Sequence, residues 1–374
     1  MAPARRPGAT PSLTVEAAAA YELLHSIVAA LDTEDAETYE IGPAWVAEAR
    51  ARAGEELIGR LSAVGFGEVD TFRHLVGLAY GAPAPRDVPA FLAHLRDTDP
   101  DEIKLHLVQF YARETRRMTP PATIRAAVAG DPDAVAEFLR TSHPEYEPWS
   151  SYLRAVLEAD AAAYRDELVA VLEAWADRVW KADSLTVMPI LERDVATKRE
   201  LQRDLPLDRF VPMATNGVEF APRPGIDRLV LIASFLQRPL VGHVEVGDAL
   251  LIIYPVADES ITAESDTPPL RLVRLSKALG DEKRLRILRS LADGEKTLME
   301  LAEAFGVAKT TMHHHMIILR AAGLVSVGVG SKRYRLRQET VPDVGALLSG
   351  YLGAAHPLSA ASRPPASNRK SAAG

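Results

Sequence analysis

The stretch TLMELAEAFGVAKTTMHHHMIILRAAGLV, residues 297–325, decides the fold of the C-terminal part of the chain. Thr297 and Glu300 have the spacing of a capping box, and Gly306 closes the short apolar segment that follows them. A longer apolar-periodic segment then runs to a second stop signal at Gly323. The sequence therefore predicts a short helix, a turn and a longer helix.

The flanking residues extend this pattern on both sides. Upstream, LRLVRLSKALGDEKRLRILRSLADG (residues 270–294) predicts two helices, because Gly280 ends the first and Asp281 can cap the second. Downstream, LVSVGVGSKRYRLR (residues 324–337) predicts a hairpin with a basic tip. Helix, short helix, longer helix and basic ribbon follow one another as in a winged helix-turn-helix, whose second helix of the pair lies in the major groove of DNA.

Three consecutive histidines, His313, His314 and His315, lie in the longer helix. Helical residues are separated by about 100°, so adjacent imidazoles diverge and the run is a poor chelator. The same spacing places the large apolar residues on one face, which is expected to pack inward: Met312, Met316 and Leu319. His315 shares this face, and we expect it to be half-buried with a backbone partner. His313 and His314 face the other side, which is either a solvated surface or a DNA-binding surface.

We predict that DNA is bound by this outer face together with the basic ribbon. The candidate DNA-binding residues are Lys309, Thr310, Thr311, His313, His314, Lys332, Arg333 and Arg335. Lysine and arginine neutralise phosphates, and polar side chains on the recognition helix can hydrogen-bond to base edges.

Residues 270–340 resemble the ArsR family of bacterial winged-helix repressors, both in LSKALGDEKRLRILRSL and in the stretch that opens this section. The resemblance implies a homodimer that binds an inverted-repeat operator in double-stranded DNA, with repression relieved by an effector. Metal-sensing members often carry Cys-x-Cys in the short helix, whereas this chain has Leu298-Met299-Glu300-Leu301 and no cysteine. A thiolate metal sensor is therefore excluded, and we predict no metal and no cofactor.

Two further positions depart from the family pattern. Ala308 stands where the family usually has a serine N-cap, and the loss of such a cap typically costs about 1 kcal/mol. Ile317 stands where the family often has lysine, which removes one phosphate contact.

Charge is distributed unevenly along the chain. Residues 268–340 hold 14 Lys and Arg against 7 Asp and Glu, a net charge of +7, while the remaining residues carry −15. A basic module on an acidic body favours binding to a polyanion. The absence of cysteine fits a reducing cytoplasm, and no run of about 18 apolar residues predicts a membrane span. Glu16, Glu22 and His25 interrupt the first apolar stretch, which argues against a signal peptide.

The fold class expected is mainly α, with a large helical N-terminal domain closed by a small antiparallel β-sheet. The clearest helix is expected over residues 150–180 with Ser150 as N-cap, a hairpin is expected around Asn216-Gly217, and residues 207–257 are expected to form the sheet. The predicted boundaries are a disordered tail at 1–12, an N-terminal regulatory and dimerisation domain at 13–262, a linker at 263–269, the winged helix at 270–340, a C-terminal helix at 341–353 and a disordered tail at 354–374.

The N-terminal domain carries no P-loop, His-x-x-Glu-His or Gly-x-Ser-x-Gly pattern. Glu102 and His106 have the i, i+4 spacing of a helical metal pair, although a surface pair is the simpler interpretation. An aromatic group could line a pocket or pack in the core: Trp149, Tyr152, Trp175 and Trp180.

Residues 228–256 resemble the end of an uncharacterised domain that precedes ArsR-type modules in high-GC actinobacteria. This resemblance implies regulation. We therefore predict a cytoplasmic regulator that is not an enzyme and whose N-terminal domain dimerises, senses a small molecule or a partner protein, or does both. The alternatives are an enzyme or a protein-interaction domain fused to an autoregulatory DNA-binding module.

Overall fold

A computed structural model describes residues 10–33, 39–114, 119–142, 147–222, 224–261, 270–328 and 332–340, with residues 345, 347–349 and 351–352 near the C-terminus. The chain divides into two compact units. Unit 1 comprises residues 1–262 and 326–333, and unit 2 comprises residues 263–325 and 334–374. The fold is mainly α, as predicted, and none of its described helices is long and apolar enough to cross a membrane.

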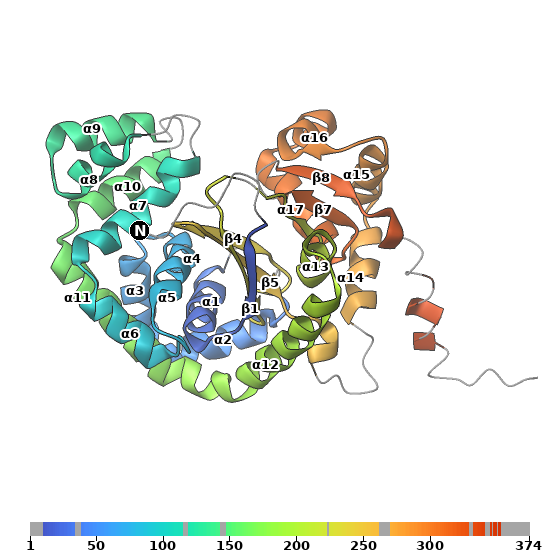
Figure 1. The fold of residues 1–374 in the computed structure, drawn as a ribbon, viewed down its shortest axis with the longest axis horizontal. Helices are drawn as coiled ribbons and strands as arrows, with labels where there is room; N and C mark the ends of the chain where they lie inside the picture. Colours follow the sequence, from blue (N-terminus) through green and yellow to red (C-terminus); the bar gives the residue numbers. More distant parts are fainter. Residues whose placement is uncertain are drawn as a thin grey trace, which may run out of the picture. The chain divides into compact units, whose positions relative to one another are not determined.

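Unit 1 contains a run of helices between one N-terminal strand and a later group of strands. In chain order its elements are β1 (Ser12–Glu16), α1 (Ala19–Leu31), α2 (Gly42–Ala53), α3 (Glu55–Val64), α4 (Asp70–His74), α5 (Val76–Gly81), α6 (Val88–Asp97), α7 (Pro100–Glu114), α8 (Pro121–Val128), α9 (Pro132–Thr141), α10 (Glu147–Glu158), α11 (Ala161–Trp175), the π-helix η2 (Ala176–Trp180), α12 (Lys181–Asp204), α13 (Leu207–Ala214), β2 (Val218–Glu219), β3 (Arg228–Ser234), β4 (Gly242–Val246), β5 (Ala249–Pro255) and η3 (Asp258–Ser260). Helices α7 to α10 cluster at one end of the unit, and α11 connects them to α3 and α6 (Figure 1).

The main sheet of unit 1 has the strand order β1-β3-β5-β4. Strands β1, β3 and β5 are parallel, and only β4 runs antiparallel to β5, so the prediction of an antiparallel sheet was wrong. Six of the seven residues in β3 and in β5 are buried, which is typical of parallel strands covered on both faces. The strand at residues 228–236 and the Gly247-Asp248 turn between β4 and β5 agree with the prediction.

The predicted hairpin at Asn216-Gly217 was also wrong. The residues before it form the helix α13, in which Phe210, Val211 and Ala214 are buried at helical spacing. Asn216 and Gly217 do form a turn with φ of 54° and 99°, but the turn joins this helix to β2. The turn signal was therefore correct, whereas the apolar run before it was predicted to be a strand and forms a helix.

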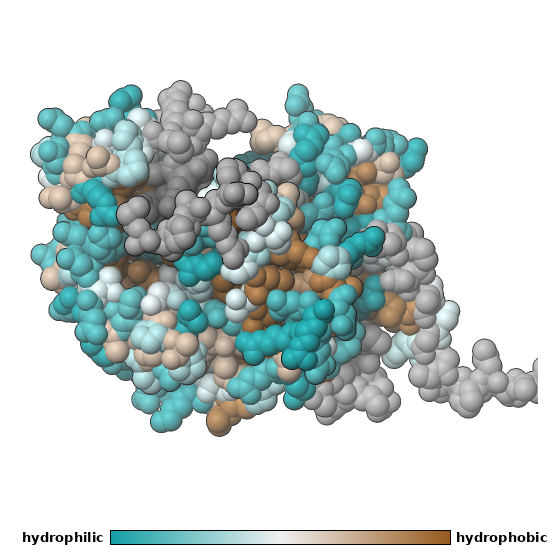
Figure 2. Space-filling view, in the orientation of Figure 1, coloured by the Kyte–Doolittle hydropathy of each residue, from teal (hydrophilic) through white to brown (hydrophobic). Residues whose placement is uncertain are grey.

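The single helix predicted over residues 150–180 is divided in the structure. Asp160 has an extended backbone and its carboxylate accepts a hydrogen bond from the Ala163 N–H at 2.8 Å, so it starts α11 as an N-cap. Ser150 lies inside α10 instead of capping it. Beyond Trp180 the chain stays helical through α12, over which the surface is mostly hydrophilic (Figure 2). The cap at Asp160 thus starts a new helix, although the apolar residues continue at helical spacing through this point.

A buried polar cluster connects α12 to the end of the main sheet. The Asp194 carboxylate is 1 % exposed and pairs with Lys198 Nζ at 2.9 Å. It also accepts hydrogen bonds from the Tyr254 hydroxyl at 2.9 Å, the Ala257 N–H at 2.8 Å and the Ser260 hydroxyl at 3.0 Å. These bonds offset the cost of burying the charge and fix the loop after β5.

Unit 2 has the predicted order of helices followed by a ribbon. Its elements are α14 (Leu270–Leu279), α15 (Glu282–Ala292), β6 (Lys296–Thr297), α16 (Leu298–Phe305), α17 (Lys309–Ala321), β8 (Arg333–Leu336, of which Arg333 belongs to unit 1) and η4 (Gln338–Thr340). Strand β7 (Val325–Gly328) belongs to unit 1 except for Val325, and the sheet that contains it has the strand order β2-β7-β8-β6. The predicted cap at Asp281 is confirmed, because its carboxylate accepts the Arg284 N–H at 2.9 Å. In the predicted helix at 341–353, residues 345, 347–349 and 351–352 are helical, while the predicted linker at 263–269 and tail at 354–374 lie outside the described residues.

Candidate nucleic-acid interface

The turn between α16 and α17 is fixed by local hydrogen bonds. The Thr297 hydroxyl accepts the Glu300 N–H at 3.2 Å, and the Glu300 carboxylate accepts the Thr297 N–H at 2.7 Å, which confirms the capping box. Gly306 ends α16 with φ of 61°, a conformation that favours glycine. The Val307 N–H then donates to the Ala302 carbonyl at 3.1 Å, so the direction in which α17 starts is set by the backbone.

One face of α17 is buried within unit 2, as its periodicity predicts. Met312, Met316 and Leu319 are between 0 and 1 % exposed. This face packs against α14 and α16. Burial of three large apolar side chains stabilises the module and fixes which face of α17 remains accessible.

The opposite face of α17 carries the predicted DNA-binding residues, all of which are exposed: Lys309, Thr310, Thr311, His313 and His314. Ile317, in the same half of the helix, is only partly exposed. The backbone therefore presents five polar side chains together, which is the arrangement that a recognition helix requires. Their contacts with DNA remain a prediction.

The environment of His315 differs in part from the prediction. The side chain is buried, at 9 % exposure, but its Nδ1 has no hydrogen-bond partner among the described residues, so the expected backbone partner is absent. Burial lowers the pKa of the imidazole, the nearby Asp281 carboxylate opposes this, and Arg284 adds to it. His315 is consequently a neutral core residue and takes no part in the exposed face.

The first turn of α17 lacks a side-chain cap. Ala308 occupies the N-cap position with ψ of 150°, and no side chain accepts a hydrogen bond there. Uncapped N–H groups at a helix N-terminus attract anions such as phosphate. Lys309, the first residue of α17, adds positive charge at the same end.

The basic ribbon is described on both sides of its tip, while residues 329–331 lie outside the described residues. Lys332 and Arg335 are exposed, and Arg333 is half-buried. Lys332 has φ of 51°, so the backbone turns sharply at the start of β8. The ribbon thus presents two exposed cations, in addition to the partly buried third.

Strand β7 has a partner that sequence reasoning missed. Within unit 1, β2 pairs with it in parallel, with Val218 opposite Val327 and Glu219 opposite Gly328. The Ser326 hydroxyl donates to the Glu219 carboxylate at 2.9 Å. A two-residue strand has no periodicity to detect, so no sequence signal could have identified this pairing.

The candidate groups in the N-terminal part have structural roles. The Glu102 carboxylate accepts a hydrogen bond from Arg125 at 2.7 Å, and His106 Nε2 lies 2.8 Å from the His74 carbonyl, so the two side chains have separate partners. Tyr152, Trp175 and Trp180 are buried in the hydrophobic core, and the side chain of Trp149 lies outside the described residues. No group of three or more His, Cys, Asp or Glu side chains within the described ranges could hold a metal ion.

Comparison with known proteins identifies the C-terminal module. Residues 281–327 match the model of the bacterial regulatory protein, arsR family, and this range begins at the cap of α15 and ends in β7. The curated proteins contain no match to the chain. The matched segment is an ArsR-family helix-turn-helix domain, which supports a DNA-binding transcription regulator.

Proposed function

We propose that this protein is a transcriptional repressor whose unit 2 binds an inverted-repeat operator as a homodimer. The observation that carries the proposal is the division of α17 into a buried apolar face and an exposed polar face. Its inner face is buried in the module, and its outer face presents Lys309, Thr311 and His313 to the outside. A two-fold dimer would place two such helices about 34 Å apart, in successive major grooves on one side of the duplex.

We further propose that unit 1 senses a small-molecule effector and is not an enzyme. The ArsR resemblance supports repression that an effector relieves, and the size of unit 1 exceeds what a dimer contact needs. As a transcriptional repressor, the protein would act in the cytoplasm. Neither a resident metal nor a cofactor is part of this proposal.

Binding to DNA is tested by genomic footprinting followed by anisotropy titrations on the recovered sites. Lys332→Ala and Arg335→Ala should weaken binding to every sequence and reduce the dependence of log K on log salt by about 1 each, because each removes one phosphate contact. Lys181→Ala is the matched control, since Lys181 is 79 % exposed on α12. Unchanged affinity and salt dependence in both ribbon variants would contradict the assignment.

Sequence preference is tested separately. Thr311→Ala and His313→Ala should change which base is preferred at one operator position, by about 1–3 kcal/mol, and should leave the salt dependence nearly unchanged. A uniform loss of affinity on all sequences would instead indicate phosphate contacts.

A further inference from the structure

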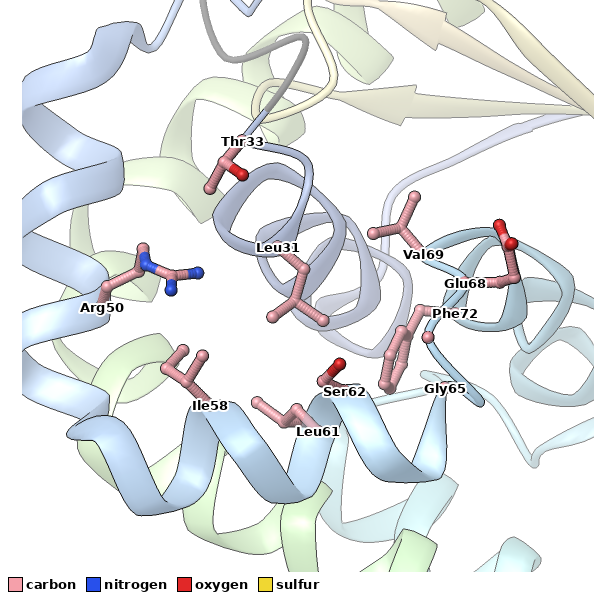
Figure 3. A pocket seen from close by; sticks show the side chains of 11 residues that line it. Leu31, Thr33, Arg50, Ile58, Leu61, Ser62, Gly65, Glu68, Val69 and Phe72 are labelled. Carbon is pink, nitrogen blue, oxygen red and sulfur yellow. The ribbon is translucent and has the colours of Figure 1, made fainter.

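Unit 1 contains a cavity of about 200 Å³ between the end of α1 and helices α2, α3 and α4 (Figure 3). Its apolar side chains are those of Leu31, Ile58, Leu61, Val69 and Phe72. Leu61 and Phe72 are fully buried and support the wall from behind, whereas Leu31 and Val69 are partly exposed and border the open space. Ser62 and Gly67 line the cavity and are exposed, which leaves an opening to solvent.

The volume is suited to a ligand of ring size. An apolar protein cavity of roughly 150 Å³ is sufficient to bind benzene. A space of about 200 Å³ therefore accommodates a ring or a branched chain of similar size and one small polar group.

One cation of the described residues faces this space. Arg50 extends from α2 toward the other labelled side chains in Figure 3 and is half-buried. Its Nη1 donates to the Ala30 carbonyl at 3.0 Å, and no carboxylate lies within ion-pair distance of it in the described part of the chain. Arg52, two residues further along α2, is by contrast paired with Asp183 at 2.9 Å. Arg50 thus retains donors for a carboxylate ligand, which arginine binds in a bidentate manner.

Among the described residues, the one carboxylate that lines the cavity lies on its other side. Glu68 follows α3, and Figure 3 shows its carboxylate pointing away from Leu61 and Phe72. Burial and the neighbouring Asp70 raise the pKa of Glu68. The cavity therefore has a cation at the Arg50 end and a carboxylate at the far end, and the partly exposed Leu31 and Val69 lie between them.

We infer that this cavity is the effector site of unit 1, and that its ligand is a small monocarboxylic acid with a ring-sized apolar body. The carboxylate binds the Arg50 guanidinium, and the body packs against Leu31 and Val69, whose side chains are partly exposed. The term effector rests on the proposed function, whereas the binding of the acid does not depend on it.

Calorimetry on the full chain tests the site with benzoate as the probe. Benzoate should bind, and benzyl alcohol and benzylamine, which keep the ring but lack the carboxylate, should bind at least about tenfold more weakly. Absence of benzoate binding, or equal binding of the three compounds, overturns the inference.

Variants locate the binding. Arg50→Met should weaken benzoate binding at least about tenfold, Arg50→Lys should have a smaller effect because charge is retained, and Ser62→Phe should block the opening and abolish binding. Arg154→Met removes an arginine that is 58 % exposed on α10 and should bind as the unaltered chain does. Binding that is unchanged in both Arg50→Met and Ser62→Phe overturns the site.

The effector role has its own measurement. Benzoate should change the affinity of the full chain for its operator, and this effect should be lost in Arg50→Met. Benzoate that binds at Arg50 without changing DNA affinity overturns the effector role. If the chain binds no DNA, the proposed function fails, and the calorimetry still decides whether the acid site exists.

Discussion

Asp194 shows what a single buried side chain contributes. Its carboxylate is hydrogen-bonded to three groups besides the Lys198 ammonium, and both charges are almost completely buried. Asp194→Asn should destabilise unit 1 by about 3–5 kcal/mol, because the Lys198 ammonium would remain buried without its counter-ion. Urea denaturation followed by tryptophan fluorescence measures this loss.

The double variant Asp194→Asn/Lys198→Met serves as the control. It removes the uncompensated charge and should recover part of the lost stability. A double variant that is no more stable than Asp194→Asn would show that the hydrogen bonds matter more than the charge.

His315 makes the stability of unit 2 depend on pH. Burial places the pKa of the folded imidazole below its ordinary value of 6.5, and Asp281 opposes this shift while Arg284, His314 and Lys283 add to it. As pH falls, the unfolded state therefore binds the proton first. The free energy of unfolding is highest above pH 6.5 and decreases as pH falls from 6.5 to the pKa of the folded state. Hydrogen exchange in α17 should give a lower opening free energy at pH 5.5 than at pH 8.

His315→Met should remove this pH dependence, because methionine fills the buried position without a titratable group. His313→Gln, an exposed change on the same helix, should keep it. Equal pH dependence in His315→Met and the unaltered chain would assign the effect to another group.

At the scale of the element, α17 begins without a cap. Ala308 already has the extended backbone of an N-cap residue, so a hydroxyl there needs no rearrangement. Ala308→Ser should stabilise α17 by about 1 kcal/mol, measured as the opening free energy of its amides. Ala304→Ser, at an exposed position inside α16, should change stability by less than about 0.5 kcal/mol. Equal effects at the two positions would argue against capping.

The elements of unit 2 were predictable because their signals are local. Asp281, Thr297 with Glu300, and Gly306 each act within a few residues, and the structure confirms all of these caps. The inner face of α17 followed from helical spacing alone. The absence of a partner for His315 Nδ1 among the described residues could not be predicted, because it depends on which groups other elements place around the imidazole.

The main sheet was mispredicted because its pairing is long-range. Residues Ser12 to Glu16 pair with Arg228 to Ile232, more than two hundred residues later, and no local pattern reveals that register. Ser12 was assigned to a disordered tail and residues 13–16 to the helical domain, whereas these residues form β1. The error at residues 207–214 had a different cause, since a short apolar run fits either period.

At the scale of the whole molecule, the two units have different spectroscopic properties. The four tryptophans, Trp45, Trp149, Trp175 and Trp180, all lie in unit 1. The main hydrophobic core likewise consists of residues up to Val256, with Ile261 packed at its edge. Tryptophan fluorescence therefore follows the unfolding of unit 1, and hydrogen exchange in α16 and α17 follows unit 2.

A substitution in one core should therefore change the readout of its own unit and leave the readout of the other unit unchanged. Leu301→Ala, at a fully buried position in α16, should lower the exchange free energy of α16 and α17 by about 2–5 kcal/mol and leave the fluorescence midpoint in place. Leu168→Ala, at a fully buried position in α11, should do the reverse. If either variant shifts both readouts equally, the two cores unfold as one cooperative system.

The pairing of β2 with β7 limits where the chain can be cut. A fragment that begins at residue 263 retains the helices of unit 2 but lacks Val218 and Glu219, so β7 keeps an edge of unsatisfied N–H and C=O groups. Such an edge recruits strands from other molecules and promotes aggregation. Self-association of the isolated DNA-binding fragment would thus reflect an exposed strand edge, and it should not be taken for the operator-binding dimer.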